Sequence, residues 1–251
     1  MPQVRKQQGL FLGSPDAGNR RGRNKVFQVC QVQKHLEGIC LEKMLLKIPF
    51  YKNLKDGSCV QVAMQSVLKH FLDKEYSLDE LDKLTGRKDG FFTWTSQIVP
   101  VLYDLGLNVK YYSRTALDPF LEGENYIRKH YSDSAEKILK VTDMPIFIDS
   151  IKKLKKYNLF EKKILPFENI EKNLLNGYIP MVVINHKTIK GEDGWLGHFV
   201  VITGFDKENI FYHESGPFEP TPNKKVSKEM FIKAWNDSST DNDVVIVYGK
   251  R

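Results

Sequence analysis

Cys59 is the residue whose position in this sequence best suits covalent chemistry. It follows the turn-forming run Asp56-Gly57-Ser58 and precedes apolar residues at helical spacing: Val60, Ala63, Met64, Val67, Leu68 and Phe71. We therefore predict a helix that begins at about Cys59, with its first N–H groups close to the sulfur. That position favours the thiolate, which is the nucleophilic form of cysteine. A cysteine that only packs in the core is the alternative, so the assignment needs a partner residue.

His198 is the candidate partner. It lies 139 residues after Cys59 and opens the apolar run His198-Phe-Val-Val-Ile-Thr-Gly204, which predicts a buried strand. Papain-like enzymes place their histidine about 130–150 residues after the cysteine. A histidine at the start of a buried strand can equally be structural, and the spacing leaves both interpretations open.

Glu214 is the candidate for the group that orients the histidine. If the chain reverses within residues 205–209, the end of the returning strand lies opposite or diagonal to His198. Near that end only Glu214 offers a carboxylate to accept the second imidazole N–H. His213 should point to the other face of the strand. Asp206 is the rival carboxylate, but we expect it in the turn at the far end.

Five blocks of the sequence together resemble the bacteriocin-processing-type (double-glycine) papain-like cysteine peptidases, and most closely their standalone branch without a transporter. The blocks are Ile48–Tyr51 with Asp56–Cys59, Thr93–Thr95, Gly197–Asp206, Tyr212–Pro217 and Lys225–Trp235. The resemblance covers about residues 46–250. It implies an α+β, papain-like cysteine peptidase fold, in which a helical N-terminal half packs on an antiparallel sheet.

The resemblance also implies roles for single residues. Cys59 is the nucleophile, His198 the general base and then acid, and Glu214 the orienting carboxylate where the family usually has aspartate. Six residues before its cysteine the family has a glutamine that binds the oxyanion. This sequence has the shorter amide Asn53 there, for which an ordinary loop role is equally open. No metal or other cofactor is implied.

Two tryptophans are candidate substrate-binding residues. Trp94, with Phe91 and Phe92, could line a groove for a peptide or acyl group near the cysteine, although such aromatic clusters more often belong to the core. Trp195 lies close to His198 in the glycine-rich stretch 191–197. That stretch is either a flap over the site or a plain connection.

The elements that must position these residues can be read from periodicity and capping. Helices are predicted over 77–86, over 96–105, within 118–160, in a segment that ends at Gly177, and over 228–235. Ser77 and Glu80 form a capping box at the start of the first, and Ser227 caps the last. Extended segments are predicted from Met44, and over 108–113, 163–166, 178–185, 198–205, 209–214 and 243–248. Helices followed by an antiparallel sheet indicate an α+β plan. The lysines of residues 152–156 lie off the apolar stripe and indicate a solvated helix face rather than a nucleic-acid site.

The composition is that of a globular protein with a basic N-terminal extension. Of 251 residues, 41% are hydrophobic and 27% charged, and the formal net charge is +7. Residues 1–43 carry eight Lys or Arg against three Asp or Glu. We therefore predict a basic, disordered tail over residues 1–43 and one papain-like domain over residues 44–251. Since the excess charge lies in the tail, no nucleic-acid partner is expected.

Cysteine usage and hydropathy point to a cytoplasmic location. The three cysteines show no paired spacing, which suits a reducing compartment. No apolar run approaches the ~20 residues that a membrane span needs, so no membrane partner is expected. The sequence does not decide the oligomeric state.

Three functions are compatible with these residues. The leading one is a cysteine-dependent hydrolase that cleaves a peptide or small amide through a thioester acyl-enzyme. The same chemistry would serve an acyltransferase that passes the acyl group to an amine. The third is a noncatalytic peptide-binding domain of the same fold, for which the departures at Asn53 and Glu214 leave room.

Overall fold

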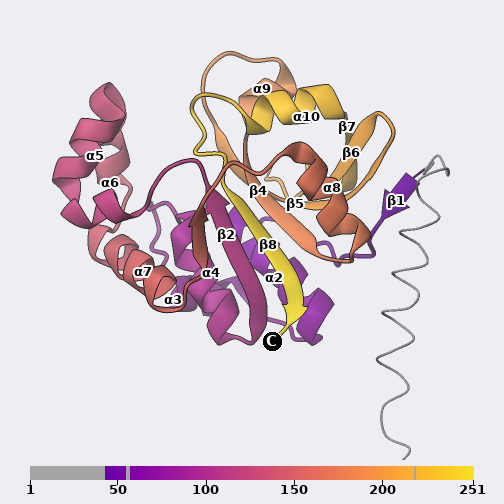
Figure 1. The fold of residues 1–251 in the computed structure, drawn as a ribbon, viewed down its shortest axis with the longest axis horizontal. Helices are drawn as coiled ribbons and strands as arrows, with labels where there is room; N and C mark the ends of the chain where they lie inside the picture. Colours follow the sequence, from indigo (N-terminus) through magenta and orange to yellow (C-terminus); the bar gives the residue numbers. More distant parts are fainter. Residues whose placement is uncertain (1–42, 55–56, 218) are drawn as a thin grey trace, which may run out of the picture. The chain divides into compact units, whose positions relative to one another are not determined.

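Eight strands form one sheet within the residues that the computed structural model describes, which are 43–54, 57–217 and 219–251 (Figure 1). The order across the sheet is β3-β2-β8-β4-β5-β6-β7, and β1 pairs with β5. All pairings are antiparallel except that of β2 with β3. The strands are β1 (Lys43–Leu45), β2 (Leu107–Ser113), β3 (Phe160–Lys162), β4 (Ile179–Asn185), β5 (Gly197–Asp206), β6 (Asn209–Glu214), β7 (Thr221–Ser227) and β8 (Val244–Lys250).

Helices of the first half of the chain precede most of the sheet. They are α2 (Cys59–Leu72), α3 (Leu78–Thr85), α4 (Thr95–Asp104), α5 (Glu124–Tyr131), α6 (Ala135–Lys140) and α7 (Met144–Lys156), with the short 3₁₀ turns η1 (Asp118–Glu122) and η2 (Ser132–Ser134). In the second half, α8 (Phe167–Leu175), α9 (His186–Lys190) and α10 (Lys228–Trp235) lie between strands. The predicted α+β class is confirmed. No helix of the described residues is both long and apolar enough to cross a membrane.

Both faces of the sheet are covered by helices, because the side chains of a strand alternate between two hydrophobic clusters. On β5, Phe199 and Val201 join the cluster of α2, α4 and α7, whereas Val200 and Ile202 join the cluster of α8 and α10. The strand β8 alternates in the same way. The central strands are therefore buried on both sides, which explains their nearly continuous apolar sequences.

The hairpin of β5 and β6 forms where the sequence predicts it. Only residues 207 and 208 separate the two strands. Asp206 lies at the turn, where its Oδ1 accepts the N–H groups of Glu208 and Asn209 at 2.9 and 2.7 Å. Asp206 is therefore at the opposite end of the hairpin from the start of β5, as expected.

Predicted caps account for several helix ends. Ser77 and Glu80 form the predicted capping box of α3, and the Ser227 hydroxyl accepts the Met230 N–H at the start of α10. The lysines of residues 152–156 are exposed, while Phe147 and Ile151 of the same helix are buried. This is the solvated face that the sequence predicts.

Two predicted segments need correction. Residues 163–166 form no strand; the strand is β3, three residues earlier, and it pairs in parallel with the end of β2. The helical stretch predicted for 118–160 is broken into short helices and ends at Lys156. The position of β3 follows from its partner strand: Tyr111 of β2 opposes Phe160, which keeps that residue extended.

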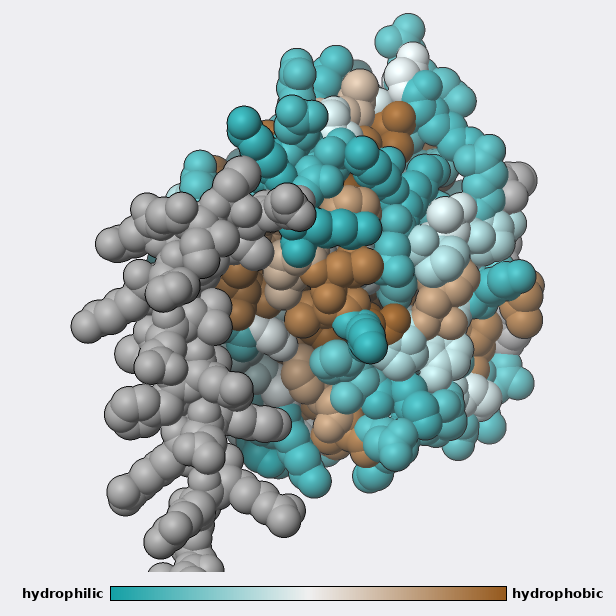
Figure 2. Space-filling model, turned by 90° about the vertical axis from the view of Figure 1, so that its right-hand side faces the viewer, coloured by the Kyte–Doolittle hydropathy of each residue, from teal (hydrophilic) through white to brown (hydrophobic). Residues whose placement is uncertain are grey.

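One surface of this fold is shown in Figure 2, viewed from the side on which β1 and β7 lie in Figure 1. Its rim is mostly hydrophilic and a hydrophobic area lies near the centre. The strand β7 contributes mostly exposed or half-buried residues. A polar edge strand of this kind resists pairing with another chain.

The predicted boundary at residue 44 adjoins residues 1–42, which are outside the described range, and it stays a prediction.

Candidate active site

Cys59 is the first residue of α2, as the turn before it predicts. Gly57, at φ +71°, makes the turn, and an added Cβ on Gly57 would lie 3.5 Å from the buried guanidinium of Arg87. The Ser58 side chain forms no capping hydrogen bond to α2. The first N–H groups of the helix are therefore not capped by Ser58. They face the N-terminus of α2, where the half-buried Cys59 lies.

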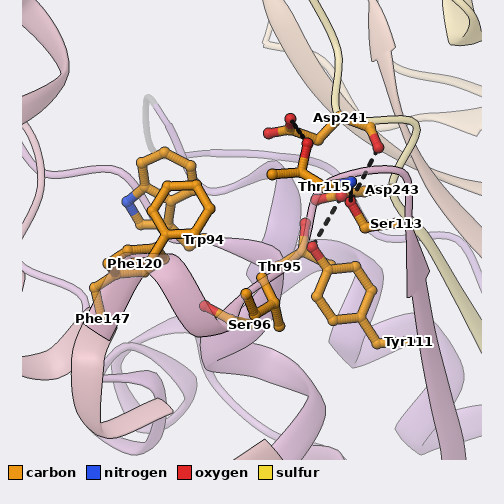
Figure 3. A pocket seen from close by; sticks show the side chains of 11 residues that line it. Trp94, Thr95, Ser96, Tyr111, Ser113, Thr115, Phe120, Phe147, Asp241 and Asp243 are labelled. Carbon is orange, nitrogen blue, oxygen red and sulfur yellow. Dashed lines mark hydrogen bonds between the residues drawn. The ribbon is translucent and has the colours of Figure 1, made fainter. Parts of the chain in front are cut away.

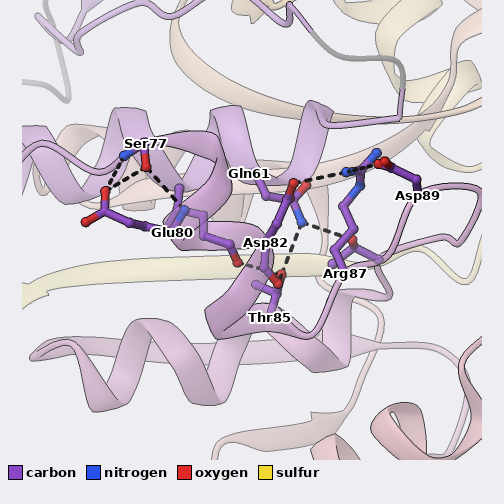
Figure 4. Close-up of polar contacts among 9 residues, drawn as sticks. Gln61, Ser77, Glu80, Asp82, Thr85, Arg87 and Asp89 are labelled. Carbon is purple, nitrogen blue, oxygen red and sulfur yellow. Dashed lines mark hydrogen bonds and ion pairs between the residues drawn. The ribbon is translucent and has the colours of Figure 1, made fainter.

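A buried polar network fixes α2 and this turn (Figure 4). Gln61 Nε2 donates to Thr85 Oγ1 at 3.2 Å and to Thr93 Oγ1 at 3.0 Å, so one amide joins α2, α3 and the loop before α4. Arg87 pairs with Asp82 at 3.1 Å and with Asp89 at 3.6 Å. Because Gln61, Thr85 and the Arg87 side chain are buried, these bonds hold the start of α2 in one place, whereas Asp89 is exposed.

The structure brings His198 and Glu214 to Cys59. The thiol is hydrogen-bonded to the His198 side chain, and it also accepts the backbone N–H groups of Phe199 and Val60. On the other side of the ring, His198 Nε2 lies 2.7 Å from Glu214 Oε1. Both side chains are buried. His213 does not join these hydrogen bonds: its Nε2 lies 3.0 Å from the carbonyl oxygen of Ile48, and it borders a small cavity together with Cys59.

The three groups shift one another's pKa values. Burial raises the pKa of the Cys59 thiol, but the hydrogen bond and charge of His198 outweigh burial, so the pKa is lowered from its ordinary value. Burial lowers the pKa of His198, yet its bonds to Cys59 and Glu214 raise it to about 10. Burial raises the pKa of Glu214, and its bonds to two histidines hold it well below the usual range. The three shifts act in the same sense: each favours the charged form, which is the thiolate of Cys59, the imidazolium of His198 and the carboxylate of Glu214.

His186 is a member of this cluster that the sequence did not reveal. It is the first residue of α9, and its Nε2 lies 3.2 Å from Glu214 Oε2. The rings of His186 and His198 are 5.1 Å apart. The signal that could have found it is positional: His186 directly follows β4, the strand that pairs with the start of β5. Pairing partners of a central strand cannot be read from the sequence alone.

Asn53 is buried beside the same site. Its backbone N–H donates to the carbonyl oxygen of Ser215 at 2.8 Å. This bond ties the segment before Cys59 to the residue after Glu214. The oxyanion role of the Asn53 amide stays a prediction.

The two candidate tryptophans differ in their surroundings. Trp94 is half-buried: its Nε1 donates to Thr142 Oγ1 at 3.2 Å, and its ring packs 4.8 Å from that of Phe147. Trp195 is 43% exposed and folds over Gly197, the residue before His198. Trp195 is thus the one of the two that presents aromatic surface to solvent next to the histidine. Substrate binding by either stays a prediction.

A cavity of about 20 Å³ with both polar and aromatic lining residues borders Trp94 and Asp243 (Figure 3). Tyr111 donates to Asp243 at 2.8 Å, and Thr115 donates to Asp241 at 2.6 Å. Burial and the charge of Asp241 raise the pKa of Asp243 to about 6. The cavity is large enough for one water molecule. These groups satisfy one another, which indicates a structural role at the ends of β2 and β8.

The sequence matches one family model, described as guanylylate cyclase, over residues 48–247. The chain belongs to the guanylylate cyclase family. This family is not the one that the five motifs resemble, so the resemblance to the bacteriocin-processing peptidases is not confirmed by the family match. No curated protein was found to match the sequence.

Solved structures similar to this member of the guanylylate cyclase family include two peptidases. One is a putative C39-like peptidase from Bacillus anthracis, with 13% identity, coverage of 84% of this chain and 98% of that chain, and a TM-score of 0.49. The other is the peptidase domain of Streptococcus ComA, a bi-functional ABC transporter of a quorum-sensing pathway, with 15% identity, coverage of 82% and 98%, and a TM-score of 0.44. At these identities and scores, function has to be argued from this chain's own residues.

Proposed function

We propose that this protein is a cysteine-dependent hydrolase of amide or peptide bonds, acting through a thioester acyl-enzyme on Cys59. The observation that supports it most is the lowered pKa of a thiol that is hydrogen-bonded to His198 at the N-terminus of a helix. Nucleophile, base and orienting carboxylate in hydrogen-bond contact are the usual arrangement for nucleophilic catalysis. A cysteine that only packs would need none of these contacts.

In the first half of the reaction, the Cys59 thiolate attacks the carbonyl carbon of the substrate. The C–S bond forms while the carbonyl π electrons move to oxygen. As the tetrahedral intermediate collapses, the C–N bond breaks and the His198 imidazolium gives its proton to the leaving amine. Glu214, 2.7 Å from Nε2, holds the ring with its other nitrogen directed at the sulfur and the leaving group.

In the second half, water releases the acyl group. Neutral His198 accepts a proton from water as its oxygen attacks the thioester carbonyl, and the C–S bond then breaks. The products are a carboxylic acid and the restored pair of Cys59 thiolate and His198 imidazolium. If an amine takes the place of water, the same steps make the protein an acyltransferase.

The oxyanion of both intermediates needs donors. One donor is the backbone N–H of Cys59, which is present whichever residue occupies position 53. The buried Asn53 amide is the candidate for the second donor. Loss of one such donor costs about 100- to 1,000-fold in turnover. The shorter amide of Asn53, compared with glutamine, is compatible with a slow enzyme.

The family description suggests a different reaction, the formation of a cyclic guanylate. Phosphoryl-transfer chemistry relies on cations that neutralise the phosphates, commonly metal ions held by carboxylates. Within residues 43–54, 57–217 and 219–251, no group of three or more His, Cys, Asp or Glu could hold a metal ion. Cys59, His198 and Glu214, by contrast, lie in hydrogen-bond contact, and we propose the acyl-transfer reaction in preference.

The test is to trap the acyl-enzyme. The full chain is incubated at pH 6–7 with a mixture of peptides from a tryptic digest, quenched in acid and examined by intact-protein mass spectrometry. We expect an acyl adduct on Cys59 that hydroxylamine removes, that is absent from Cys59→Ala, and that is strongly reduced in His198→Ala.

Other results would point to the alternatives. Peptide bound without an adduct would favour a noncatalytic binding domain, and adducts transferred to added glycinamide would favour an acyltransferase. Parallel incubation with GTP and Mg²⁺ tests the family description: cyclic guanylate formed by both the wild type and Cys59→Ala, with no adduct, would refute the hydrolase.

A further inference from the structure

Glu214 lies between two histidines, and only one of them belongs to the proposed hydrolase mechanism. Its Oε1 is 2.7 Å from His198 Nε2, and its Oε2 is 3.2 Å from His186 Nε2. Both atoms are buried, and within the described residues neither has a well-aligned hydrogen bond, with each other or with any other group. Building on the proposed function, we propose that His186 is a second positioning residue of the site, which donates its Nε2–H to Glu214 Oε2 and so fixes the plane of the carboxylate.

The reason for a second anchor is the freedom of a glutamate side chain. The terminal torsion of glutamate is broad, so a carboxylate held through one oxygen can still rotate about its last bond. At Oε1 the carboxylate also accepts the Gly216 N–H at 3.2 Å. Oε2 has no such backbone donor. A donor on Oε2 removes the remaining rotation, and it keeps Oε1 in line with His198.

The backbone of His186 is itself fixed by buried hydrogen bonds. Its N–H donates to the Leu196 carbonyl oxygen at 2.8 Å. The preceding residue, Asn185, is 1% exposed, accepts the Leu196 N–H at 3.1 Å and donates to Asp237 Oδ2 at 3.1 Å. These bonds join the start of the connection between β4 and β5, at Asn185 and His186, to its end at Leu196. They hold the His186 ring against Glu214, where its side chain is only 13% exposed.

The other charge near Glu214 does not replace this contact. Lys224 Nζ is 4.0 Å from Oε2 and 3.8 Å from Glu219 Oε2, and its side chain is 24% exposed. At that distance the ammonium adds an attraction but no directed hydrogen bond. The groups that face Glu214 are therefore His198 from β5, His186 from α9 and Lys224 from β7, with Cys59 beyond His198.

The experiment compares His186→Phe, which lacks a donor, with His186→Gln, whose amide nitrogen can take the place of Nε2. Lys224→Met is the control for loss of nearby charge. Two readouts are used on the full chain: the rate of Cys59 alkylation by iodoacetamide from pH 5 to 9, and the NMR signal of the His198 Nε2 proton. Thermal melting shows that each variant is folded.

We expect His186→Phe to slow alkylation at pH 6 by about ten-fold, the loss typical of a supporting hydrogen bond to a charged group. Its Nε2 proton signal should broaden through faster exchange with water. Both properties should return in His186→Gln and stay unchanged in Lys224→Met. Unchanged readouts in a folded His186→Phe would overturn the proposal, as would an equal effect of Lys224→Met.

The two proposals fail separately. The Nε2 proton signal reports the contact between His198 and Glu214 without any reaction, so it tests His186 even if no acyl-enzyme is found. An alkylation profile of an ordinary thiol in the wild type would instead refute the hydrolase. If His186→Phe fails to fold, His186→Gln decides: normal readouts support the proposal, and readouts as low as those of His198→Ala overturn it.

Discussion

Removal of the His198 imidazole should reverse the pKa shift of the Cys59 thiol. In His198→Ala the hydrogen bond and charge that lower this pKa are lost, while burial, which raises it, stays. The thiol should then titrate above its ordinary value. The N–H groups of α2 alone would not compensate, because a helix terminus contributes about 0.3–1 kcal/mol at most surface sites.

The size of the effect follows from the ionised fraction. A thiol with the ordinary pKa of about 8.5 is about 0.3% ionised at pH 6. Full ionisation through the ion pair can therefore raise the alkylation rate by at most about 300-fold. A more acidic thiolate is also a weaker nucleophile, with a Brønsted coefficient of about 0.4–0.5, which reduces the gain to about 10-fold. His198→Ala should lose at least this factor at pH 6 and much less at pH 9.5.

The assay measures the iodoacetamide rate of the full chain at both pH values and compares their ratio among variants. His70→Gln is the matched control, because His70 lies in the last turn of the same helix. The other cysteines are replaced by serine so that only Cys59 reacts. Equal ratios in the wild type and in His198→Ala would refute the reasoning, since the sulfur would then react independently of the imidazole.

Three further predictions follow from single contacts. Glu214→Gln keeps an acceptor but removes the charge, so it should lower the pKa of His198 from about 10 and reduce alkylation at pH 6 by about 10- to 100-fold; an NMR titration of His198 that is unchanged would contradict this. Gly204→Ala places a Cβ against the Met44 carbonyl oxygen and should lower the free energy of unfolding, measured in urea, by about 1–3 kcal/mol. Hydrogen exchange should be faster at the Leu46 N–H, which donates to Thr203. Unaltered exchange would show that β1 is not packed there. The pKa of Asp243 is raised from 3.8 to about 6, so the folded state holds this proton more tightly than the unfolded state. This group therefore makes stability fall as pH rises from about 4 to 6. Asp243→Asn should flatten that part of the profile of stability against pH, whereas a steeper slope would refute the assignment.

The sequence predicted the local parts of the site well. The periodic residues after Cys59 determine α2, and the short turn after Asp206 brings Glu214 back to His198, because both depend on neighbours within a few residues. Ser77 with Glu80 and Ser227 also behave as their capping patterns predict. Such signals lie within one turn of helix or one hairpin, where tertiary contacts have little influence.

Long-range pairing accounts for what the sequence did not predict. The strand β7 was missed because Thr221–Ser227 is polar, contains Pro222 and lacks alternation, and pairing with β6 alone holds it extended. The strand β3 was placed too late because its partner, the end of β2, is almost fifty residues earlier. His186 was missed for the same reason, since its value depends on the neighbouring strand and not on its own surroundings in the chain.

The position of β8 in the sheet determines when the two halves of this protein can pack together during folding. The last strand of the chain lies between β2 and β4, and it completes both hydrophobic clusters. Until β8 is in place, the two halves of the sheet are not joined and two long edges stay open. Cys59 and His198 both precede β8 in sequence, and α2 packs against both β5 and β8, so we expect the thiol to become reactive only after β8 has joined the sheet.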